Sequence, residues 1–236
     1  MTIVRKWRYS MGKRFALVML LGLVVLTGCS TSEDISSMEI SEVIVKVQTA
    51  LNKLSKEEIH TQEKTTMTYP GGADTVEVER WYANGNCLYI GKQSNGITTT
   101  RLQYGDKVYS KTSLNENWSQ AKETESFVPF GVNQSTAEQF SENTVTSRKV
   151  ENDEYCVIFE FLPQTAVQNY TKNQVSLFFT EKWELLRVET HAEYSMESWV
   201  DGSSTEIISD AIIEYQDTSA KQIKKQIKDT YADVCE

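Results

Sequence analysis

The stretch that decides the fold is Val76-Glu77-Val78-Glu79-Arg80-Trp81-Tyr82-Ala83-Asn84-Gly85-Asn86-Cys87-Leu88-Tyr89-Ile90. Before Asn84-Gly85 the side chains alternate, which is typical of a β-strand. Asn-Gly is favoured in two-residue type I′ turns, because both positions need a positive φ. The chain then returns as a second strand, so the segment predicts an antiparallel hairpin.

More hairpins are expected on both sides of an irregular stretch at residues 123–143. Asn95-Gly96 is a second predicted turn, and the strands around it are short and close together. The expected strands include 76–82, 87–90, 97–104, 107–110, a short one near Trp118, 145–150, 155–161, 175–179, 185–194 and 203–215. Because no helix separates neighbouring strands within each group, the pattern predicts an antiparallel meander.

Two amphipathic helices are expected to flank the strands. Ser36-Ser37-Met38-Glu39 has the spacing of a capping box, and apolar residues then recur at steps of three and four from Ile40 to Leu54. Residues 219–231 predict a second helix. A large sheet must cover its apolar face, so we expect an α+β fold in which a curved antiparallel sheet, a half-barrel, carries both helices on its concave side.

The charge of the chain excludes one class of partner. The 236 residues carry a formal net charge of −9. Residues 1–28 contain five basic residues and no acidic residue. The remaining 19 Lys and Arg against 33 Asp and Glu leave residues 29–236 with a net charge of −14. Such a surface repels nucleic acid and anionic lipid headgroups, so we expect no nucleic-acid partner.

The N-terminal segment has the pattern of an export signal. Basic residues from Arg5 to Arg14 precede an apolar run, 16–26, that is too short to span a bilayer. Leu26-Thr27-Gly28-Cys29 follows and resembles the lipobox of bacterial lipoproteins. The resemblance implies that residues 1–28 are a signal peptide, that Cys29 is acylated, and that residues 29–36 form a lipidated tether. A plain secretory signal and an uncleaved anchor are the alternatives.

The mature chain as a whole resembles LolA/LppX-type envelope lipoproteins. The resemblance rests on the signal with Cys29, the leading helix, the tyrosine-rich meander and Ile212-Ile213-Glu214-Tyr215-Gln216-Asp217 before the final helix. It implies that residues 37–236 are a single half-barrel domain that binds a lipid or a lipoprotein acyl chain. It also implies a lipid anchor on the extracytoplasmic face of the cell membrane, and the tethering scheme suits a Gram-positive cell.

Apolar residues gather on the strand faces of the second half of the chain. If the sheet curves, they line its concave side, and a core opened by the segment 127–132 would hold a hydrophobic ligand. The candidate ligand-binding residues are Tyr155, Val157, Phe159, Phe161, Leu177, Phe179, Leu186 and Val188. The alternative is a filled core, in a domain that serves as a protein-interaction or sensing module of the cell envelope.

The sequence holds no recognisable catalytic or metal-binding motif. Gly-x-Ser-x-Gly, His-Glu-x-x-His and phosphate-loop patterns are all missing from it. His191, between Glu189 and Glu193, is expected to be solvent-facing, with a metal or general-base role as the alternative. We therefore expect no enzyme activity, no metal and no cofactor, the alternative being an active site assembled from scattered carboxylates and tyrosines.

The cysteines after Cys29 are too few and too far apart for a redox or zinc motif. Cys87, Cys156 and Cys235 form no Cys-x-x-Cys pair. We expect three buried or half-buried thiols, with one bridge between two of them as the alternative.

Overall fold

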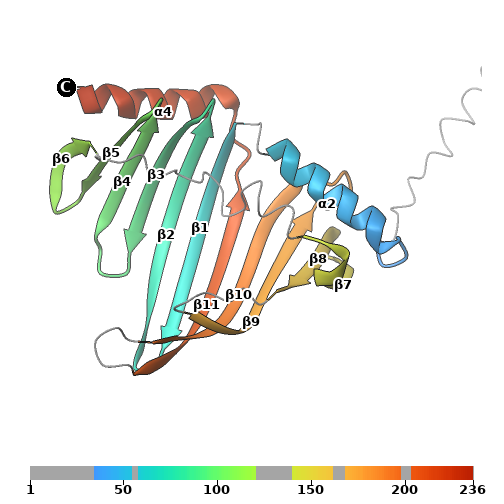
Figure 1. Cartoon of the computed structure of the whole chain (residues 1–236). Coiled ribbons are helices and arrows are strands. Elements are labelled where there is room, and N and C mark those ends of the chain that lie inside the picture. Colours follow the sequence, from blue (N-terminus) through green and yellow to red (C-terminus); the bar gives the residue numbers. More distant parts are fainter. Residues whose placement is uncertain (1–34, 55–57, 121–139, 162–167, 198–202, 236) are drawn as a thin grey trace, which may run out of the picture. The chain divides into compact units, whose positions relative to one another are not determined.

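The computed structural model describes residues 35–54, 58–120, 140–161, 168–197 and 203–235, which belong to one compact unit, Asp34–Glu236. Its described strands form one open antiparallel sheet. One helix precedes the strands in the sequence and another follows them (Figure 1). The strand order is β6-β5-β4-β3-β2-β1-β11-β10-β9-β8-β7, so the first and last strands pair at the centre. The expected α+β fold with a half-barrel-like antiparallel sheet is confirmed.

Most elements lie where the sequence predicts them. Their bounds are α2 (Ile40–Leu54), β1 (Ile59–Tyr69), β2 (Gly72–Ala83), β3 (Asn86–Gln93), β4 (Thr98–Tyr104), β5 (Lys107–Thr112), β6 (Asn115–Gln120), η1 (Glu142–Thr144), β7 (Val145–Glu151), β8 (Glu154–Glu160), β9 (Gln168–Phe179), β10 (Leu185–Glu197), β11 (Ser204–Tyr215) and α4 (Ala220–Cys235).

The predicted Asn-Gly hairpin is confirmed. Asn84 and Gly85 have φ values of 53° and 79°, as a type I′ turn requires, and they join β2 to β3 directly. Asn152 and Asp153 make an equivalent turn between β7 and β8, with φ values of 52° and 64°. Asn and Asp tolerate this region better than other residues with a side chain, so local sequence fixes both hairpins.

Helix α2 begins later than the capping-box spacing suggests. Ile35 is fully buried and turns into the core, where the Met38 amide donates to its carbonyl. The Ser36 carbonyl accepts hydrogen bonds from the Arg148 side chain on β7. These contacts hold the segment before Ile40 as a turn, so tertiary packing overrides the local cap.

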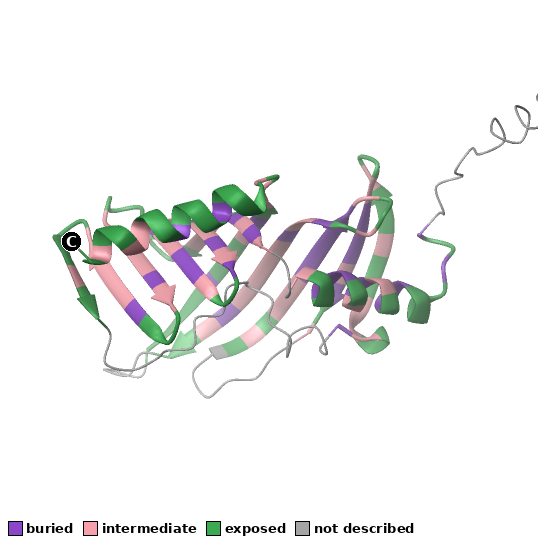
Figure 2. Ribbon diagram, turned by 90° about the horizontal axis from the view of Figure 1, so that it is seen from above, coloured by how far each residue is buried: buried purple, intermediate pink, exposed green. Residues whose placement is uncertain are grey.

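The two helices pack on opposite faces of the sheet. Helix α4 contacts the face that carries Trp81, Leu88 and Leu102, whereas α2 packs with Val157, Leu177, Val188 and Ile213 on the other face. The pairing Lys64↔Ile212 in the centre of the sheet shows that even-numbered residues of β1 and β11 share a face, and His60↔Trp81 places that face under α4. Ile213 therefore points away from α4. Figures 1 and 2 show the helices on opposite sides and at different ends of the sheet.

This arrangement corrects the expectation that both helices cover the concave side. Alternation within a strand shows that one face is apolar, but it does not show which face of the sheet that is. Only the β1–β11 register relates the two halves, and it puts the apolar faces of the early and late strands on opposite sides. Each helix therefore covers its own core.

Several predicted features lie outside the described residues. These are the signal peptide, Cys29 and the tether as far as residue 34, together with the segment 127–132. Among the helices that the structure describes, none is both long enough and apolar enough to cross a membrane.

Candidate functional site: a groove beside the C-terminal helix

A groove of about 550 Å³ lies over strands β11, β1, β2 and β3. Most of its side chains belong to the face that carries α4, as the strand registers show. It is lined by Gln62, Glu63, Lys64, Glu77, Val78, Glu79, Ile90, Lys92, Ile212 and Glu214. This volume is in the range of sites that bind small molecules.

The strand registers arrange the polar side chains of the groove in two rows that cross the sheet. Directly paired residues of neighbouring strands stand side by side on one face. The Glu79 row consists of Glu79, Gln62 and Glu214, and the Lys64 row consists of Lys92, Glu77 and Lys64. Within the groove, the first row holds two carboxylates and no cation, although Arg187 on β10 stands in register with Glu214 at the end of this row. The second row holds two ammonium groups around one carboxylate.

Two isoleucines give the groove its apolar surface. Ile90 on β3 is paired with Glu79, and Ile212 on β11 is paired with Lys64, so one isoleucine stands at an end of each row. Ile212 is 46% exposed, whereas the next residue, Ile213, is only 7% exposed. Ile213 is buried against α2 on the other face. Successive residues of a strand face opposite sides, so Ile212 contributes to the groove rather than to a core.

The side chain of Glu79 is held in place by an aromatic and hydrogen-bonded support. His60 Nε2 lies 2.8 Å from Glu79 Oε1, and His60 Nδ1 lies 2.7 Å from the Thr218 hydroxyl oxygen. The imidazole stacks on Trp81, with ring centroids 4.8 Å apart and planes 10° apart. Both ring nitrogens are thus engaged, and Glu79 is presented to the groove by a rigid neighbour.

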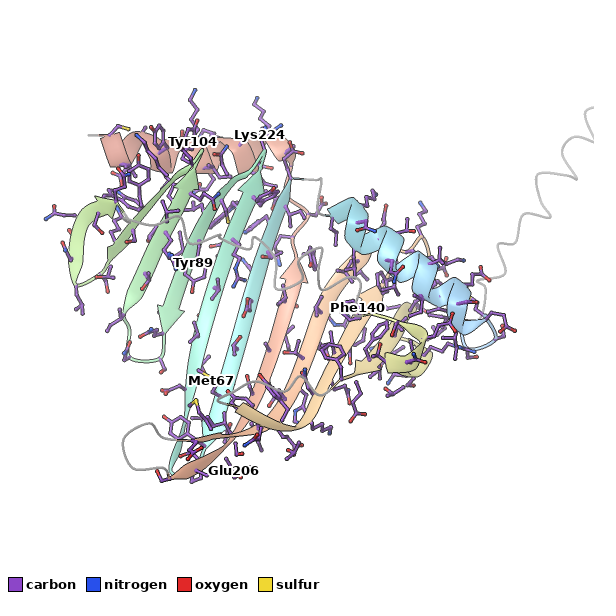
Figure 3. The ribbon with its side chains drawn as sticks, viewed as in Figure 1. Met67, Tyr89, Tyr104, Phe140, Glu206 and Lys224 are labelled. Atoms are coloured by element: carbon purple, nitrogen blue, oxygen red, sulfur yellow. The ribbon has the colours of Figure 1, made fainter. Side chains whose placement is uncertain are left out.

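The start of α4 fixes this support from the other side. The Gln222 amide donates to the Ser219 hydroxyl, and the Gln222 side chain accepts from the Ser219 amide, which is a capping box. Lys224 Nζ lies 2.6 Å from Glu58 Oε1, next to the beginning of β1. Figure 3 labels Lys224 on α4. These contacts tie the helix to the strand that carries His60.

The charged groups of the groove are mostly unpaired within the described structure. Lys64, Glu77, Lys92 and Glu214 make no ion pair and no side-chain hydrogen bond with any described residue. Opposite charges paired across strands normally attract one another. Here they are left available to a ligand, and Glu79 is the one carboxylate of the two rows with a fixed partner.

The same sheet face carries a second charged region over strands β8 to β11, which we call the ion-pair ladder. It consists of Glu154, Arg187, Glu189, His191, Glu193 and Asp210. The Arg187 guanidinium contacts both Glu154 and Glu189, and its carbon lies 3.6 Å from the centroid of the Phe178 ring. In contrast to the groove, every charge named in the ladder has a partner.

His191 bridges two strands of the ladder. Its Nδ1 lies 2.7 Å from Asp210 on β11, and its Nε2 lies 3.0 Å from Glu193 on its own strand. Hydrogen bonds to Glu193 and Asp210 raise the pKa of His191 above its usual 6.5, against a smaller opposing effect of desolvation and of Lys172. The predicted solvent-facing position between Glu189 and Glu193 is confirmed, since the side chain is 31% exposed.

The predicted ligand-binding residues lie mainly in the core beneath α2. Val157, Phe159, Leu177 and Phe179 are fully buried there, and Tyr155 and Val188 nearly so. Phe140, beside α2 in Figure 3, packs edge-on against Phe159 with ring centroids 4.6 Å apart. None of the eight predicted residues lines the groove. Their role in ligand binding stays a prediction, and it requires α2 to move away from the sheet.

Two of the eight residues are not among the buried members of this core. A β-bulge between Leu185 and Arg187 shifts the alternation, so Leu185 is buried in the core while Leu186 is only half-buried and outside the cluster. Phe161 follows the end of β8 and packs against the edge of the core, partly buried. The bulge cannot be recognised from alternation alone, because the apolar pair Leu185-Leu186 fits either register.

The three cysteines described by the structure are free thiols. Cys87 and Cys156 are buried and Cys235 is exposed, so the expectation of buried or half-buried thiols is confirmed for the first two and wrong for Cys235, which lies in the last turn of α4. Desolvation raises the pKa of Cys87 to about 12 and that of Cys156 to about 11. Neither buried thiol is therefore a nucleophile at neutral pH.

A second, smaller hollow of about 280 Å³ lies between α2 and the β9–β10 turn. Lys46, Lys53, Lys182 and Trp183 are among its lining residues, and Trp183 has a φ of 61°. The Trp183 ring packs against Tyr155 and Phe179, which accounts for its place at the edge of the α2 core.

Within the described ranges, no cluster of three or more His, Cys, Asp or Glu side chains is placed to hold a metal ion.

The groove residues were not predicted from the sequence. The available signal was the adjacent pair Ile212-Ile213, of which only one member can enter a given core. Lys64, Glu77 and Lys92 look like ordinary exposed charges until the register aligns them in one row. The sequence therefore carried a hint of an apolar surface outside the core, but not its location.

Comparisons with known proteins do not assign the chain to a family. No family model matches it, and no curated protein matches its sequence. Among solved structures, it is similar to a DUF1329 family protein from Desulfovibrio piger, with 8% identity and a TM-score of 0.30 over 76% of this chain and 92% of that one. It is also similar to an S-type phycobiliprotein lyase from Guillardia theta, with 6% identity and a TM-score of 0.30 over 78% and 96%. Likeness at this level identifies neither a ligand nor an activity for this chain.

Proposed function

We propose that this chain is a lipid-anchored protein of the extracytoplasmic face of a Gram-positive cell membrane, which binds an amphiphilic ligand in the groove beside α4. The observation that carries the proposal is the groove itself, about 550 Å³ in volume, with the exposed Ile212 beside unpaired charges. An apolar surface with a few polar groups around it is the usual composition of a ligand site. The ligand class, a lipid or the acyl chain of a lipoprotein, follows the sequence resemblance.

The proposed anchor would keep the domain close to a membrane. Under this proposal Cys29 carries the lipid, and five residues separate it from the described Ile35. The six chain steps from Cys29 to Ile35 reach at most about 20 Å. A permanently tethered domain cannot carry a ligand between membranes, so it would receive, hold or present a molecule at the surface where it is anchored. A Cys29→Ser chain should lose radiolabelled palmitate and leave the membrane fraction; unchanged labelling would exclude this anchor.

Binding in the groove is tested with a matched pair of variants. Ile212 and Ile208 lie on β11, on the same face, and are 46% and 42% exposed, but only Ile212 lines the groove. The chain from residue 30 onward contains the whole compact unit. Native mass spectrometry after incubation with a single-chain amphiphile should show a bound species for the wild type and for Ile208→Asp. Ile212→Asp should bind at least about tenfold more weakly, since burying a carboxylate against an acyl chain is unfavourable.

A protein-interaction or sensing module is the second candidate function. The observation that favours it is the packed core beneath α2, in which most of the predicted ligand-binding residues are buried against the helix. A clean apo mass in the experiment above, with no amphiphile bound by the wild type, would favour this candidate over the first.

A further inference from the structure

The charges of the groove are segregated along the strands. The Glu79 row contributes two carboxylates and the Lys64 row contributes two ammonium groups, with Glu77 between them. On each strand the two rows are two residues apart, which corresponds to about 7 Å. A ligand that spans both rows therefore meets a negative surface at one end and a positive surface at the other.

We infer that the ligand of the groove is a zwitterionic amphiphile, with its ammonium group at the Glu79 row and its phosphate or carboxylate group at the Lys64 row. This inference rests on the proposed binding of an amphiphile and names its headgroup. A purely anionic headgroup would meet Glu79 and Glu214, and a purely cationic one would meet Lys64 and Lys92. A zwitterion satisfies both rows at once, and long Glu and Lys side chains can adjust to the distance between its charges.

The contacts around Glu79 support the position of the ammonium group. His60 occupies one carboxylate oxygen of Glu79 and is itself held by Thr218 and by stacking on Trp81. The second oxygen remains for the ligand, at a fixed place. Glu214 faces it across Gln62, whose amide oxygen adds an acceptor between the two carboxylates. An ammonium group bound there would be attracted electrostatically to several oxygens at once, whether or not it carries N–H donors.

The Lys64 row is suited to an anionic group by its surplus charge. Lys64 and Lys92 stand on either side of Glu77, and none of the three has another described partner. One carboxylate cannot neutralise two ammonium groups, so one positive charge is left for a phosphate or carboxylate monoanion. Ile212 continues this row on β11 and offers the adjoining apolar surface for the acyl chain.

The inference is tested with four amphiphiles that share one acyl chain and are used below their micellar concentrations. They are a lysophosphatidylcholine, a lysophosphatidylglycerol, an alkyl trimethylammonium salt and a monoacylglycerol. The chain from residue 30 onward should bind the lysophosphatidylcholine at least about tenfold more tightly than the other three, measured by native mass spectrometry and calorimetry. Equal binding of all four, or tighter binding of a singly charged one, would overturn the inference and leave the proposed function standing. Binding of none would overturn the proposed function itself.

A charge-reversal pair locates the effect in the groove. Lys64→Glu combined with Lys92→Glu should abolish the preference for the zwitterion and make the alkyl trimethylammonium salt the tightest ligand. Lys107→Glu combined with Lys228→Glu changes the net charge of the protein by the same amount outside the groove and should leave the order of affinities unchanged. Both double variants are checked for an unchanged far-ultraviolet circular dichroism spectrum. The same loss of preference in both would show a net-charge effect and overturn the inference.

Discussion

The groove and the ion-pair ladder lie side by side on one face of the same sheet and use their charges differently. In the ladder, Arg187 is shared between Glu154 and Glu189 and covers the Phe178 ring. In the groove, Lys64, Glu77 and Lys92 stand next to one another in register without forming an ion pair in the described structure. Charges that stabilise the fold are paired with each other, so an adjoining set left unpaired is available for binding.

The difference is also one of exposure at the Arg187–Glu154 pair, although Glu189, Glu193 and Asp210 of the ladder are 40%, 43% and 59% exposed. The side chains of Arg187 and Glu154 are 23% and 24% exposed, whereas Lys64, Glu77 and Lys92 are all exposed. Ion pairs gain strength as they are withdrawn from water, and pairs of fully exposed charges contribute little. We therefore expect substitutions in the ladder to change stability and substitutions in the groove to change affinity.

The largest expected effect is on stability, in a matched pair of variants. Arg187→Met keeps an aliphatic stem over Phe178 but leaves Glu154 and Glu189 facing each other without a cation. We expect a loss of about 2 kcal/mol in the free energy of unfolding, because carboxylates that are partly withdrawn from water lose their shared partner. Lys64→Met should change it by less than about 0.5 kcal/mol, as for most surface substitutions.

Urea unfolding measures both variants, provided that the slope with denaturant is unchanged. Equal and small losses in the two variants would mean that the ladder is no more structural than the groove. The contrast between the two regions would then lie in geometry alone.

The second effect is a change in the reactivity of a thiol beneath the ladder. Cys156 is buried on this sheet face, directly paired with Phe178, and desolvation raises its pKa to about 11. It should react with iodoacetamide only when the structure opens, while the exposed Cys235 reacts at once. A loss of about 2 kcal/mol corresponds to a roughly thirtyfold larger open population, so Arg187→Met should accelerate labelling of Cys156 by up to that factor.

Cys87 is the internal control for this measurement. It is buried on the opposite face of β3 from the groove and the ladder, and its pKa is raised to about 12. If Arg187→Met opens the ladder locally, labelling of Cys156 rises and that of Cys87 does not. If both rise together, Arg187 acts on global stability, and if neither changes, the ladder does not protect Cys156.

The local elements of the fold follow from the sequence, whereas their long-range arrangement does not. Asn84-Gly85 determines its hairpin through backbone conformation alone. The spacing of apolar residues at three and four positions determines α2 and α4. These local features were therefore predicted correctly. The placement of the helices on opposite faces depends on the pairing of β1 with β11, which are separated by most of the chain. Long-range register is set by packing and leaves no local signature.

The candidate site was out of reach of the sequence for the same reason. The aromatic and aliphatic residues Phe159, Leu177 and Phe179 are conspicuous, and the structure places them in a core. The groove is built instead from Lys64, Glu77 and their neighbours, which are common surface residues. Their significance lies in being unpaired and aligned across three strands, and neither property can be read from composition or periodicity.

The smallest effect is a pH dependence of stability that belongs to the ladder and not to the groove. Hydrogen bonds to Glu193 and Asp210 raise the pKa of His191 above 6.5, so the folded state binds its proton more tightly than the unfolded state does. The resulting stabilisation is fully present below about pH 6.5 and is lost as the pH rises through the raised folded-state pKa. Because the side chain is 31% exposed, we expect this stabilisation to amount to about 0.5 kcal/mol.

His191→Gln keeps a polar side chain that does not titrate, so the difference in urea midpoint between wild type and variant should shrink from pH 6 to pH 8.5. A difference that stays constant over this range would show that the imidazolium contributes nothing to the ladder, and that pairing there rests on Arg187 alone.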